Sequence, residues 1–370
     1  MKGDMQSWTP NVASIIEHAK ELHPTTEIVS RMISGEIHRT NYEEVCIRAR
    51  KLASSLEKDG YKKGDVLATL ALNTFRHLEM YFGISGMGAI THTLNFRLHP
   101  EQAVYIINHA EDKIIFCELP FIPILEGLKD QLKTVEKYVI LCNESELPET
   151  TLGNAISYEE YIKDGDEDYK WPELEDDAAC ALCYTSGTTG NPKGVLYSHK
   201  SNIYHATSAY SALTIDRDDC ILMVVPMFHV LAWGIPYFGP MTGNKLVMPG
   251  IGMEGELLYE LIDQEEVNST FGVPTVWMQL LAYCREHKKV LSSVKNTIIG
   301  GSALSLAMLK EFDEVHDVNV IHAWGMTEMS PLGTTNLPTK EMEAMSKEEK
   351  YTLQLKQGRP VFGVELKIID

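Results

Sequence analysis

Tyr184-Thr185-Ser186-Gly187-Thr188-Thr189-Gly190-Asn191-Pro192-Lys193-Gly194 is the most informative stretch of this 370-residue chain. It contains three glycines, four aliphatic hydroxyls and one lysine, and it lies between an apolar run (178–184) and a second β-rich run (195–197). Glycine lets backbone N–H groups converge on an anion without interference from a Cβ atom. The hydroxyls add donors and Lys193 adds a mobile charge. The stretch therefore predicts a loop that grips a polyphosphate.

The loop differs from the two best-known phosphate-binding patterns. A Walker A loop needs Gly-Lys followed by Ser or Thr, whereas Lys193 follows Pro192 and precedes Gly194. The Gly-x-Gly-x-x-Gly spacing of a dinucleotide turn is also missing. A surface hairpin rich in turn residues is the alternative, and it explains the glycines and Pro192. It does not explain four hydroxyls and a lysine in one connection between strands.

The composition limits the classes of partner. The chain has 33 basic and 52 acidic residues, a net charge of −19, and 44% hydrophobic residues, as in ordinary globular proteins. An acidic surface argues against nucleic acid or an anionic membrane as partner. It also repels a nucleotide. A polyphosphate site therefore has to be made locally positive by Lys193, backbone N–H groups and a metal ion.

Targeting and redox signals favour a cytoplasmic protein. Residues 1–11 contain no apolar signal-peptide core. The longest apolar stretch, 221–238, is broken by prolines and a histidine, so it predicts buried core and not a transmembrane segment. Seven scattered cysteines indicate reduced thiols. Cys180 and Cys183 form a single C-x-x-C pair inside an apolar run, and we expect core thiols there.

Apolar β-branched runs alternate with helical patterns, which predicts an α/β fold with mostly parallel sheets covered by helices. A capping pattern at 40–43 and Gly60 bound one expected helix. The other expected helices are 74–87, 100–110 and 304–312, with a charged, helical surface segment at 340–356. The expected strands are 65–72, 114–117, 138–142, 178–184, 195–197, 221–225, 245–248, 297–299, 318–321 and 363–370.

Three later segments carry chemistry where expected strands end. Pro226-Met227-Phe228-His229-Val230 places an imidazole on an apolar turn, although a lone histidine is more often a core residue. Gly300-Gly301-Ser302-Ala303 opens a helix where backbone can approach a ring or an anion. His322-Ala323-Trp324-Gly325-Met326-Thr327-Glu328 offers an aromatic face, a hydroxyl and a carboxylate suited to Mg²⁺. Each segment is a weak signal when taken alone.

Their order after the loop is specific. The chain resembles the AMP-forming acyl-CoA synthetases of the adenylate-forming superfamily, and the likeness covers essentially its whole length. Residues 184–194 match that family's phosphate loop, and 226–230, 300–303, 324–328 and 358–365 follow in the family's order. Among subgroups it is most similar to fatty-acid–CoA and 3-methylmercaptopropionate–CoA ligases. It departs from them at Leu231, where these relatives usually carry Asn.

The resemblance implies a fold and a reaction. The expected fold is a large N-terminal domain with two parallel-rich sheets in an αβαβα arrangement, followed by the start of a small β-barrel. We expect sub-domains at 1–177, 178–335 and 336–370 within an AMP-binding region that spans 1–370. The implied reaction joins a carboxylic acid to CoA through an acyl-AMP, with ATP, Mg²⁺ and coenzyme A. The acid is a short-, medium- or long-chain fatty acid or 3-methylmercaptopropionate.

The family's site residues can be placed on this sequence one by one. The implied catalytic residues are Lys193, His229, Thr327 and Glu328. The implied nucleotide-binding residues are Thr185, Ser186, Gly187, Thr188, Thr189, Gly190, Lys193, Gly301, Ser302, Ala303, His322, Ala323, Trp324, Gly325, Met326 and Thr327. Val230, Trp233 and Gly300 are expected to line the acyl channel, and Thr185 and Glu328 to hold Mg²⁺. Trp324 replaces the commoner Tyr and is expected to stack on adenine.

Two other interpretations stay open at this point. The family's ribose-binding motif and its small C-terminal domain have no counterpart before Asp370, so the chain is expected to be a truncated enzyme of low activity. A catalytically incomplete nucleotide- or acyl-binding module is therefore one alternative. An amino-acid adenylation domain is the other, but His229 stands where that class places an acidic residue. The oligomeric state is also left open by the sequence, with a homodimer as one alternative, because relatives often form one.

Overall fold

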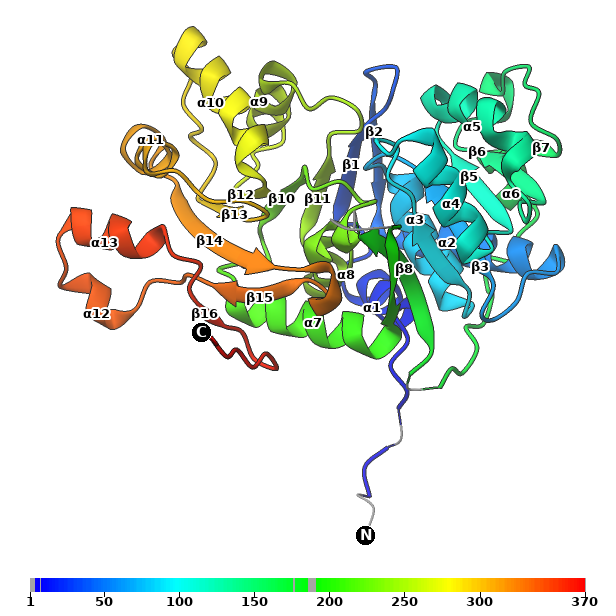
Figure 1. The fold of residues 1–370 in the computed structure, drawn as a ribbon, viewed down its shortest axis with the longest axis horizontal. Helices are drawn as coiled ribbons and strands as arrows, with labels where there is room; N and C mark the ends of the chain where they lie inside the picture. The colour runs from blue at the N-terminus through cyan, green and yellow to red at the C-terminus, as the bar shows by residue number, and fades with distance from the viewer. Residues whose placement is uncertain (1–3, 7, 176, 186–190, 370) are drawn as a thin grey trace.

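The computed structural model describes residues 4–6, 8–175, 177–185 and 191–369 (Figure 1). Its helices are α1 (Ala13–Leu22), α2 (Tyr42–Lys58), α3 (Phe75–Gly86), α4 (Pro100–Ala110), α5 (Ile122–Leu128), α6 (Tyr158–Ile162), α7 (His199–Ala212), α8 (Ile235–Thr242), α9 (Gly255–Gln264), α10 (Pro274–His287), α11 (Leu306–His316), α12 (Lys340–Glu343) and α13 (Lys347–Gln354). In the described part of the chain, no helix is both long and apolar enough to cross a membrane.

A seven-stranded sheet forms the first half of the molecule. Its strands, in spatial order, are β7 (Ala155–Ser157), β6 (Lys137–Ile140), β5 (Ile114–Cys117), β3 (Val66–Leu70), β4 (Ile90–Thr93), β8 (Ala179–Thr185) and β9 (Lys193–Ser198). All neighbours pair in parallel except β8 and β9, which form an antiparallel hairpin. Because parallel strands are covered on both faces, β4 and β5 are buried along their whole length.

A nine-stranded sheet forms the second half. Its strands, in spatial order, are β16 (Arg359–Pro360), β15 (Leu332–Thr335), β14 (Asn319–Gly325), β13 (Asn296–Ile299), β12 (Ser269–Gly272), β10 (Cys220–Met223), β11 (Lys245–Met248), β1 (Glu27–Arg31) and β2 (Ile37–Asn41). The centre, from β14 to β1, is parallel. The pairs at both edges are antiparallel. The predicted α/β fold with two mostly parallel sheets is therefore confirmed.

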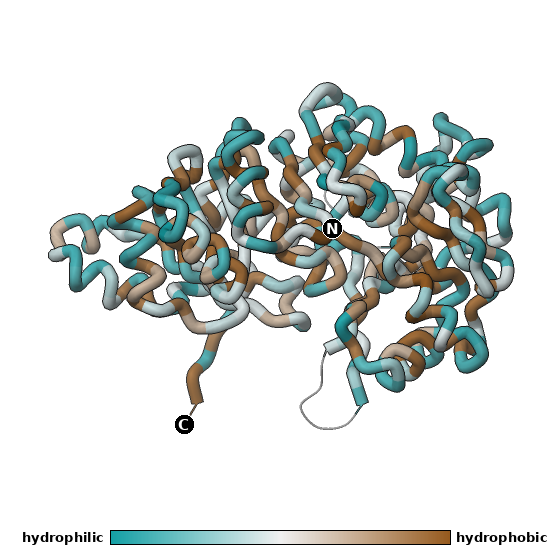
Figure 2. Tube along the Cα trace, turned by 90° about the horizontal axis from the view of Figure 1, so that it is seen from above, coloured by the Kyte–Doolittle hydropathy of each residue, from teal (hydrophilic) through white to brown (hydrophobic). Residues whose placement is uncertain are grey.

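The apolar cores separate the layers. One core lies between the two sheets and joins α1, α2, α3, α7 and α8 to strands of both. A second core packs α9, α10 and α11 on the outer face of the nine-stranded sheet. A third packs α4 and α5 on the outer face of the seven-stranded sheet. The layers therefore follow the αβαβα order, and apolar segments run through the interior of the body (Figure 2).

The sheets are not built from consecutive halves of the sequence. The early hairpin β1–β2 pairs with β11 and completes the nine-stranded sheet. The hairpin β8–β9 comes after residue 177 but pairs with β4 and completes the seven-stranded sheet. Strand pairing thus crosses the expected boundary at 177/178 in both directions. The sub-domains 1–177, 178–335 and 336–370 stay a proposal, as does the start of a β-barrel.

Most expected elements lie where the patterns indicate, with two informative differences. The N-cap of α2 is Asn41, whose side chain accepts from the Glu44 N–H, so the cap lies one residue after Thr40, where the capping pattern starts. The strand expected at 363–370 was wrong for its described part, because 363–369 has no neighbouring strand and is irregular. Ile368 and Ile369 are exposed there. All seven cysteines are free and buried, as expected of core thiols.

Candidate active site

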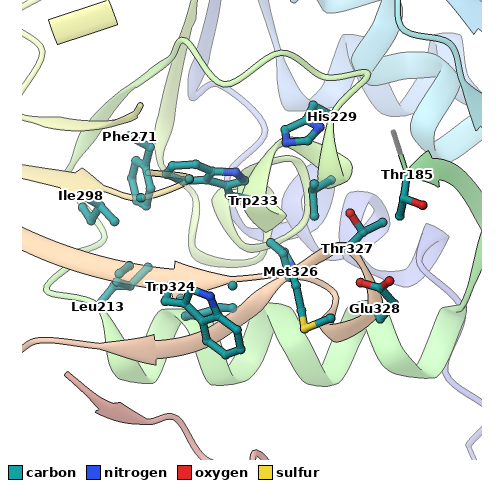
Figure 3. Close-up of a pocket in the computed structure, with 17 residues that line it drawn as sticks. Thr185, Leu213, His229, Trp233, Phe271, Ile298, Trp324, Met326, Thr327 and Glu328 are labelled. Carbon is teal, nitrogen blue, oxygen red and sulfur yellow. The ribbon is translucent and has the colours of Figure 1, made fainter. Parts of the chain in front are cut away.

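A cavity of about 440 Å³ opens where several parallel strands end (Figure 3). Most of the residues that line it come from the ends of β8, β12, β13 and β14 and from the turns after β10 and β14, with Leu213 after α7 and Leu332 at the start of β15. Ligands of open α/β sheets bind in this position, because the loops at the carboxyl ends of the strands form a crevice. The lining residues are Thr185, Leu213, His229, Val230, Trp233, Phe271, Ile298, Gly300, Gly301, Ala323, Trp324, Gly325, Met326, Thr327, Glu328, Pro331 and Leu332.

The base of the predicted phosphate loop lies at this cavity. Thr185 ends β8 and faces Lys193, the first residue of β9, across the hairpin. The Thr185 hydroxyl donates to the Lys193 carbonyl over 3.4 Å, and the Lys193 side chain is exposed beside the mouth of the loop. The predicted binding residues Ser186, Gly187, Thr188, Thr189 and Gly190 lie outside the described residues. Strand β8 therefore brings Thr185 to the cavity, and Lys193 lies opposite it across the hairpin without lining the cavity.

The turn between β14 and β15 carries the second group of predicted residues. Trp324, Met326, Thr327 and Glu328 all line the cavity; in Figure 3, Thr327 and Glu328 lie toward Thr185, whereas Trp324, at the end of β14, lies at the other end near Leu213. Residues of β9 and α7, the two elements that follow the phosphate loop in the sequence, hydrogen-bond this turn. The Tyr197 hydroxyl of β9 donates to the Thr327 carbonyl. Strand β9, which begins at Lys193, is thus bonded directly to the Thr-Glu turn.

His205 of α7 holds the other arm of this turn. Its Nε2 atom accepts from the Leu332 N–H over 3.1 Å. Burial lowers the pKa of His205 to about 4, because the imidazolium would lose its hydration. The ring is therefore neutral at pH 7. Only a neutral imidazole has a nitrogen that can accept a hydrogen bond.

The turn after β10 brings His229 to the cavity. Its imidazole is accessible from the cavity, and desolvation by the surrounding walls lowers the pKa of His229. A neutral imidazole can approach a carboxylate or a phosphate as a directional hydrogen-bonding group. The following residues wind the opposite way to a normal helix, with φ values of 39°, 42°, 49° and 56° at Val230, Leu231, Ala232 and Trp233. Such backbone strain is most often found at functional sites.

Trp233 and the glycines after β13 close one side of the cavity. A Cβ atom added at Gly300 would lie 3.2 Å from the Trp233 ring and 3.1 Å from the Ala323 carbonyl. Gly301 has a φ of +76°, which a residue with a side chain rarely adopts. Flat groups can therefore approach the backbone here, as the motif predicts. Trp233, Phe271 and Ile298 lie together at the apolar end (Figure 3).

Four of the predicted nucleotide-binding residues that the structure describes do not line the cavity: Lys193, Ser302, Ala303 and His322. Ser302 and Ala303 are exposed beyond its rim. The His322 side chain is buried, and its Nδ1 atom lies 2.9 Å from the Leu355 carbonyl of the connection after α13. Ala323 and Gly325, its neighbours along β14, do line the cavity.

Some residues that line the cavity were not among those predicted from the sequence. Leu213, Phe271 and Ile298 form apolar wall, and Leu332 lies beside the Thr-Glu turn. The rule that ligands bind at the carboxyl ends of parallel strands could have found Phe271 and Ile298, which lie on β12 and β13. Leu213 follows α7, and no local pattern marks it.

The oxygen atoms of the site fit a magnesium ion that is shared with phosphates. Thr185 offers a hydroxyl and Glu328 a carboxylate to the same cavity. Among the described residues there is no cluster of three or more His, Cys, Asp or Glu that could hold a metal by itself. Mg²⁺ typically takes one or two protein oxygens and completes its shell with water and substrate phosphates. The donor set therefore suits an ion that arrives with a nucleotide.

Comparison with known proteins places the chain in a family. Residues 16–370 match the model of the AMP-binding enzyme family. The chain is 45% identical over 372 residues to a medium-chain-fatty-acid–CoA ligase of Ectopseudomonas oleovorans, with all of this chain and 68% of the relative covered. It is 44% identical over 372 residues to a 3-methylmercaptopropionyl-CoA ligase of Ruegeria lacuscaerulensis, with 100% and 69% covered.

A solved structure has the same fold. An anthranilate CoA ligase in complex with anthranoyl-AMP superposes with a TM-score of 0.87 at 22% identity, over 100% of this chain and 68% of the other. The protein belongs to the AMP-binding enzyme family. The predicted family and the predicted enzyme class are confirmed.

Proposed function

We propose that this protein is the nucleotide- and acid-binding part of an ATP-dependent, AMP-forming carboxylic acid–CoA ligase. The observation that carries the proposal is the meeting of Thr185, Thr327 and Glu328 with His229 in one cavity. Three polar groups from the two loops that match the phosphate and magnesium motifs thus face an imidazole next to an apolar wall. A magnesium-bound triphosphate needs the polar groups, and a carboxylic acid with an apolar chain needs the imidazole and the apolar wall.

In the proposed reaction, the acid's carboxylate attacks the α-phosphorus of ATP, the bond to the bridging oxygen breaks, and pyrophosphate leaves. The thiol of CoA then displaces AMP from the acyl-AMP. Because an anion approaches a polyanion in the first step, preorganised donors are the main requirement. Bound Mg²⁺ supplies further charge neutralisation at the phosphates.

Each residue has a proposed task in this scheme. Lys193 and residues 185–190 hold the β- and γ-phosphates, with Thr185 and Glu328 on the metal. Thr327 contacts the α-phosphate, and Trp324 stacks on adenine opposite 301–303. His229 hydrogen-bonds the reacting carboxylate, while Val230, Trp233 and Gly300 line the acyl channel. The apolar wall of Phe271 and Ile298 excludes water from the reactive adenylate.

A fatty acid or 3-methylmercaptopropionate is the proposed acid. The apolar end of the cavity supports it, because Leu213, Phe271 and Ile298 offer no charged partner for an ammonium group. Relatives that are 44–45% identical are named for these acids. An amino acid would need a carboxylate where His229 stands.

Isotope exchange between pyrophosphate and ATP tests the proposal. We expect exchange that depends on the added acid, and a loss of about 10²–10³-fold in Glu328→Gln and Lys193→Ala, because each removes charge stabilisation. Glu101→Gln and Lys133→Ala change exposed residues outside the cavity and should keep full exchange. Unchanged exchange in both site variants would contradict the proposed mechanism. A series of acids from short to long chain in the same assay identifies the substrate.

The cellular location and the oligomeric state are also proposals. Seven buried thiols without a disulfide support a reducing compartment, and we propose the cytoplasm. The homodimer rests on resemblance to the family, and light scattering on the purified protein tests it.

A further inference from the structure

The turn that carries His229 has few hydrogen bonds of its own. Within residues 226–229, the His229 N–H donates to the Pro226 carbonyl over 2.9 Å. Five other backbone groups at 223–228, which are Met223 O, Val225 O, Met227 N, Met227 O and Phe228 O, bond side chains that come from outside the nine-stranded sheet. The shape of the turn is therefore imposed by contacts from the opposite layer.

Asn73 supplies three of these five contacts. It lies just after β3 of the seven-stranded sheet and is 5% exposed. Its Nδ2 atom donates to Met223 O over 2.6 Å and to Val225 O over 2.8 Å, and its Oδ1 atom accepts from Met227 N over 2.7 Å. The Asn73 carbonyl also accepts from Gly250 N over 3.2 Å, which fixes its own backbone. One amide side chain thus bonds both the end of β10 and the start of the turn.

Two further side chains complete the contact. The Tyr81 hydroxyl of α3 donates to Met227 O. The Thr93 hydroxyl of β4 donates to Phe228 O over 3.1 Å. All of these groups are buried, where an unmet backbone N–H or carbonyl costs free energy. The turn therefore has one low-energy position relative to the seven-stranded sheet, whose β8 also brings Thr185 to the cavity.

We propose that Asn73 is a positioning residue for the proposed adenylation reaction. It holds the turn so that His229, Val230 and Trp233 face the cavity at a fixed distance from the phosphate loop. The inference rests on the proposed function. Only an amide can do this, because two donors and one acceptor are used at once. Asp has no donor when ionised, and Ala offers neither group.

Steady-state kinetics of adenylate formation test the inference in Asn73→Ala and Asn73→Asp. We expect kcat/KM for the acid to fall about tenfold or more, because small misplacements of reacting groups are costly. The KM for ATP should change by less than about threefold, since the groups on β8 and β14 stay in place. Asn73→Asp should be impaired at least as much as Asn73→Ala, because it keeps the acceptor for Met227 N but places a buried carboxylate oxygen against the Met223 and Val225 carbonyls.

Ser30→Ala is the matched control. Ser30 is fully buried on β1, and its Oγ atom accepts from Phe75 N over 3.0 Å, which joins the nine-stranded sheet to the start of α3, two residues after Asn73. It bonds no group of residues 223–229. We expect both KM values and kcat to stay within about twofold of the unchanged protein, as for other sites that share no partner. If Ser30→Ala and Asn73→Ala give the same kinetic change, Asn73 has only a general structural role and the inference fails.

A spectroscopic readout separates this inference from the proposed function. Trp233 lies four residues after the turn, and its fluorescence can be isolated as the difference between each protein and its Trp233→Phe version. We expect Asn73→Ala to shift this difference spectrum to longer wavelength, because a released turn exposes the indole to water, and Ser30→Ala to leave it unchanged. The shift is expected even if no acid supports adenylation. An unchanged spectrum in a folded Asn73→Ala protein overturns the inference.

Discussion

His205 shows how one buried side chain makes the site depend on pH. Its Nε2 atom accepts from Leu332 N beside the Thr-Glu turn, so the ring has to be neutral. In the folded protein its pKa is about 4, whereas an exposed imidazole has a pKa of 6.5. Between these values the unfolded chain binds a proton that the folded chain does not. The free energy of unfolding therefore falls as the pH drops through this window, and it is insensitive to His205 above it.

The comparison of His205→Gln with the unchanged protein tests this dependence. Gln keeps an acceptor for Leu332 N but does not titrate. We expect the unfolding free energy of the unchanged protein to fall relative to that of the variant by about 1.4 kcal/mol per pH unit within the window.

Urea unfolding at about pH 7.5 and about pH 5 measures the difference, which the other titrating groups affect equally in both proteins. A difference that stays constant between the two pH values would show that His205 is protonated equally in the folded and unfolded states.

At the scale of single residues, the sequence predicts the residues that line the cavity better than the residues that hold these cavity residues in place. Thr185, Trp324 and Glu328 lie in recognisable motifs, and the structure brings them to one cavity. Asn73 and His205 have no such signal. Their partners are 150 or more residues away for Asn73 and 127 for His205, so the need for an amide or a neutral ring arises only after folding.

The left-handed turn at Val230–Gly234 is the most strained element of the site. Left-handed backbone costs about 1–2 kcal/mol for each residue with a side chain, and glycine avoids most of this cost. Ala232 has a φ of 49° and is fully buried. Ala53 is equally buried but lies inside the right-handed helix α2. The two alanines are therefore a matched pair that differs in backbone conformation.

Glycine substitution at the two positions is expected to have different effects. Ala53→Gly should lower the free energy of unfolding by about 2 kcal/mol, because it adds the helix cost of glycine to the loss of a buried methyl group. Ala232→Gly loses the same methyl but gains by relief of strain, so we expect a change of less than about 1 kcal/mol. Urea denaturation measures both. Equal destabilisation would contradict the left-handed assignment.

Elements bounded by strong local signals were predicted with their correct ends. Pro100 at the first turn gives α4 the expected bounds, and the buried apolar runs give β5 and β11 theirs. The turn at 230–234 carries no glycine before Gly234, so its φ values could not be expected from the sequence. At 363–369 the reverse happened: the sequence carries a local signal, apolar alternation, but no strand forms there. A period of two indicates a strand only where another strand lies beside it to pair.

At the scale of the molecule, the order of strands in the sheets decides where the site forms. The sequence predicts alternating strands and helices but not their pairing, because buried parallel strands are all similarly apolar. Two hairpins exchange places between the halves of the chain. One is β1–β2 in the nine-stranded sheet, and the other is β8–β9 in the seven-stranded sheet. The second exchange brings the phosphate loop from one sheet to the cavity formed by the other.

This interleaving predicts that the regions 1–177 and 178–370 do not fold separately. The first region would lack β8 and β9 and leave β4 as an open edge, and the second would lack β1 and β2 beside β11. Each would also expose its side of the core between the sheets, to which both regions contribute. An apolar surface and an unpaired strand edge of this kind favour aggregation over folding.

Urea unfolding followed by circular dichroism tests the two regions separately and together. We expect a cooperative transition for residues 1–370 and none for either region alone. Co-expression of both regions should restore the transition, since the missing strands are then supplied by the other polypeptide. A cooperative transition in isolated 178–370 would mean that β1 and β2 are dispensable to the nine-stranded sheet, and that the core between the sheets contributes little to its stability.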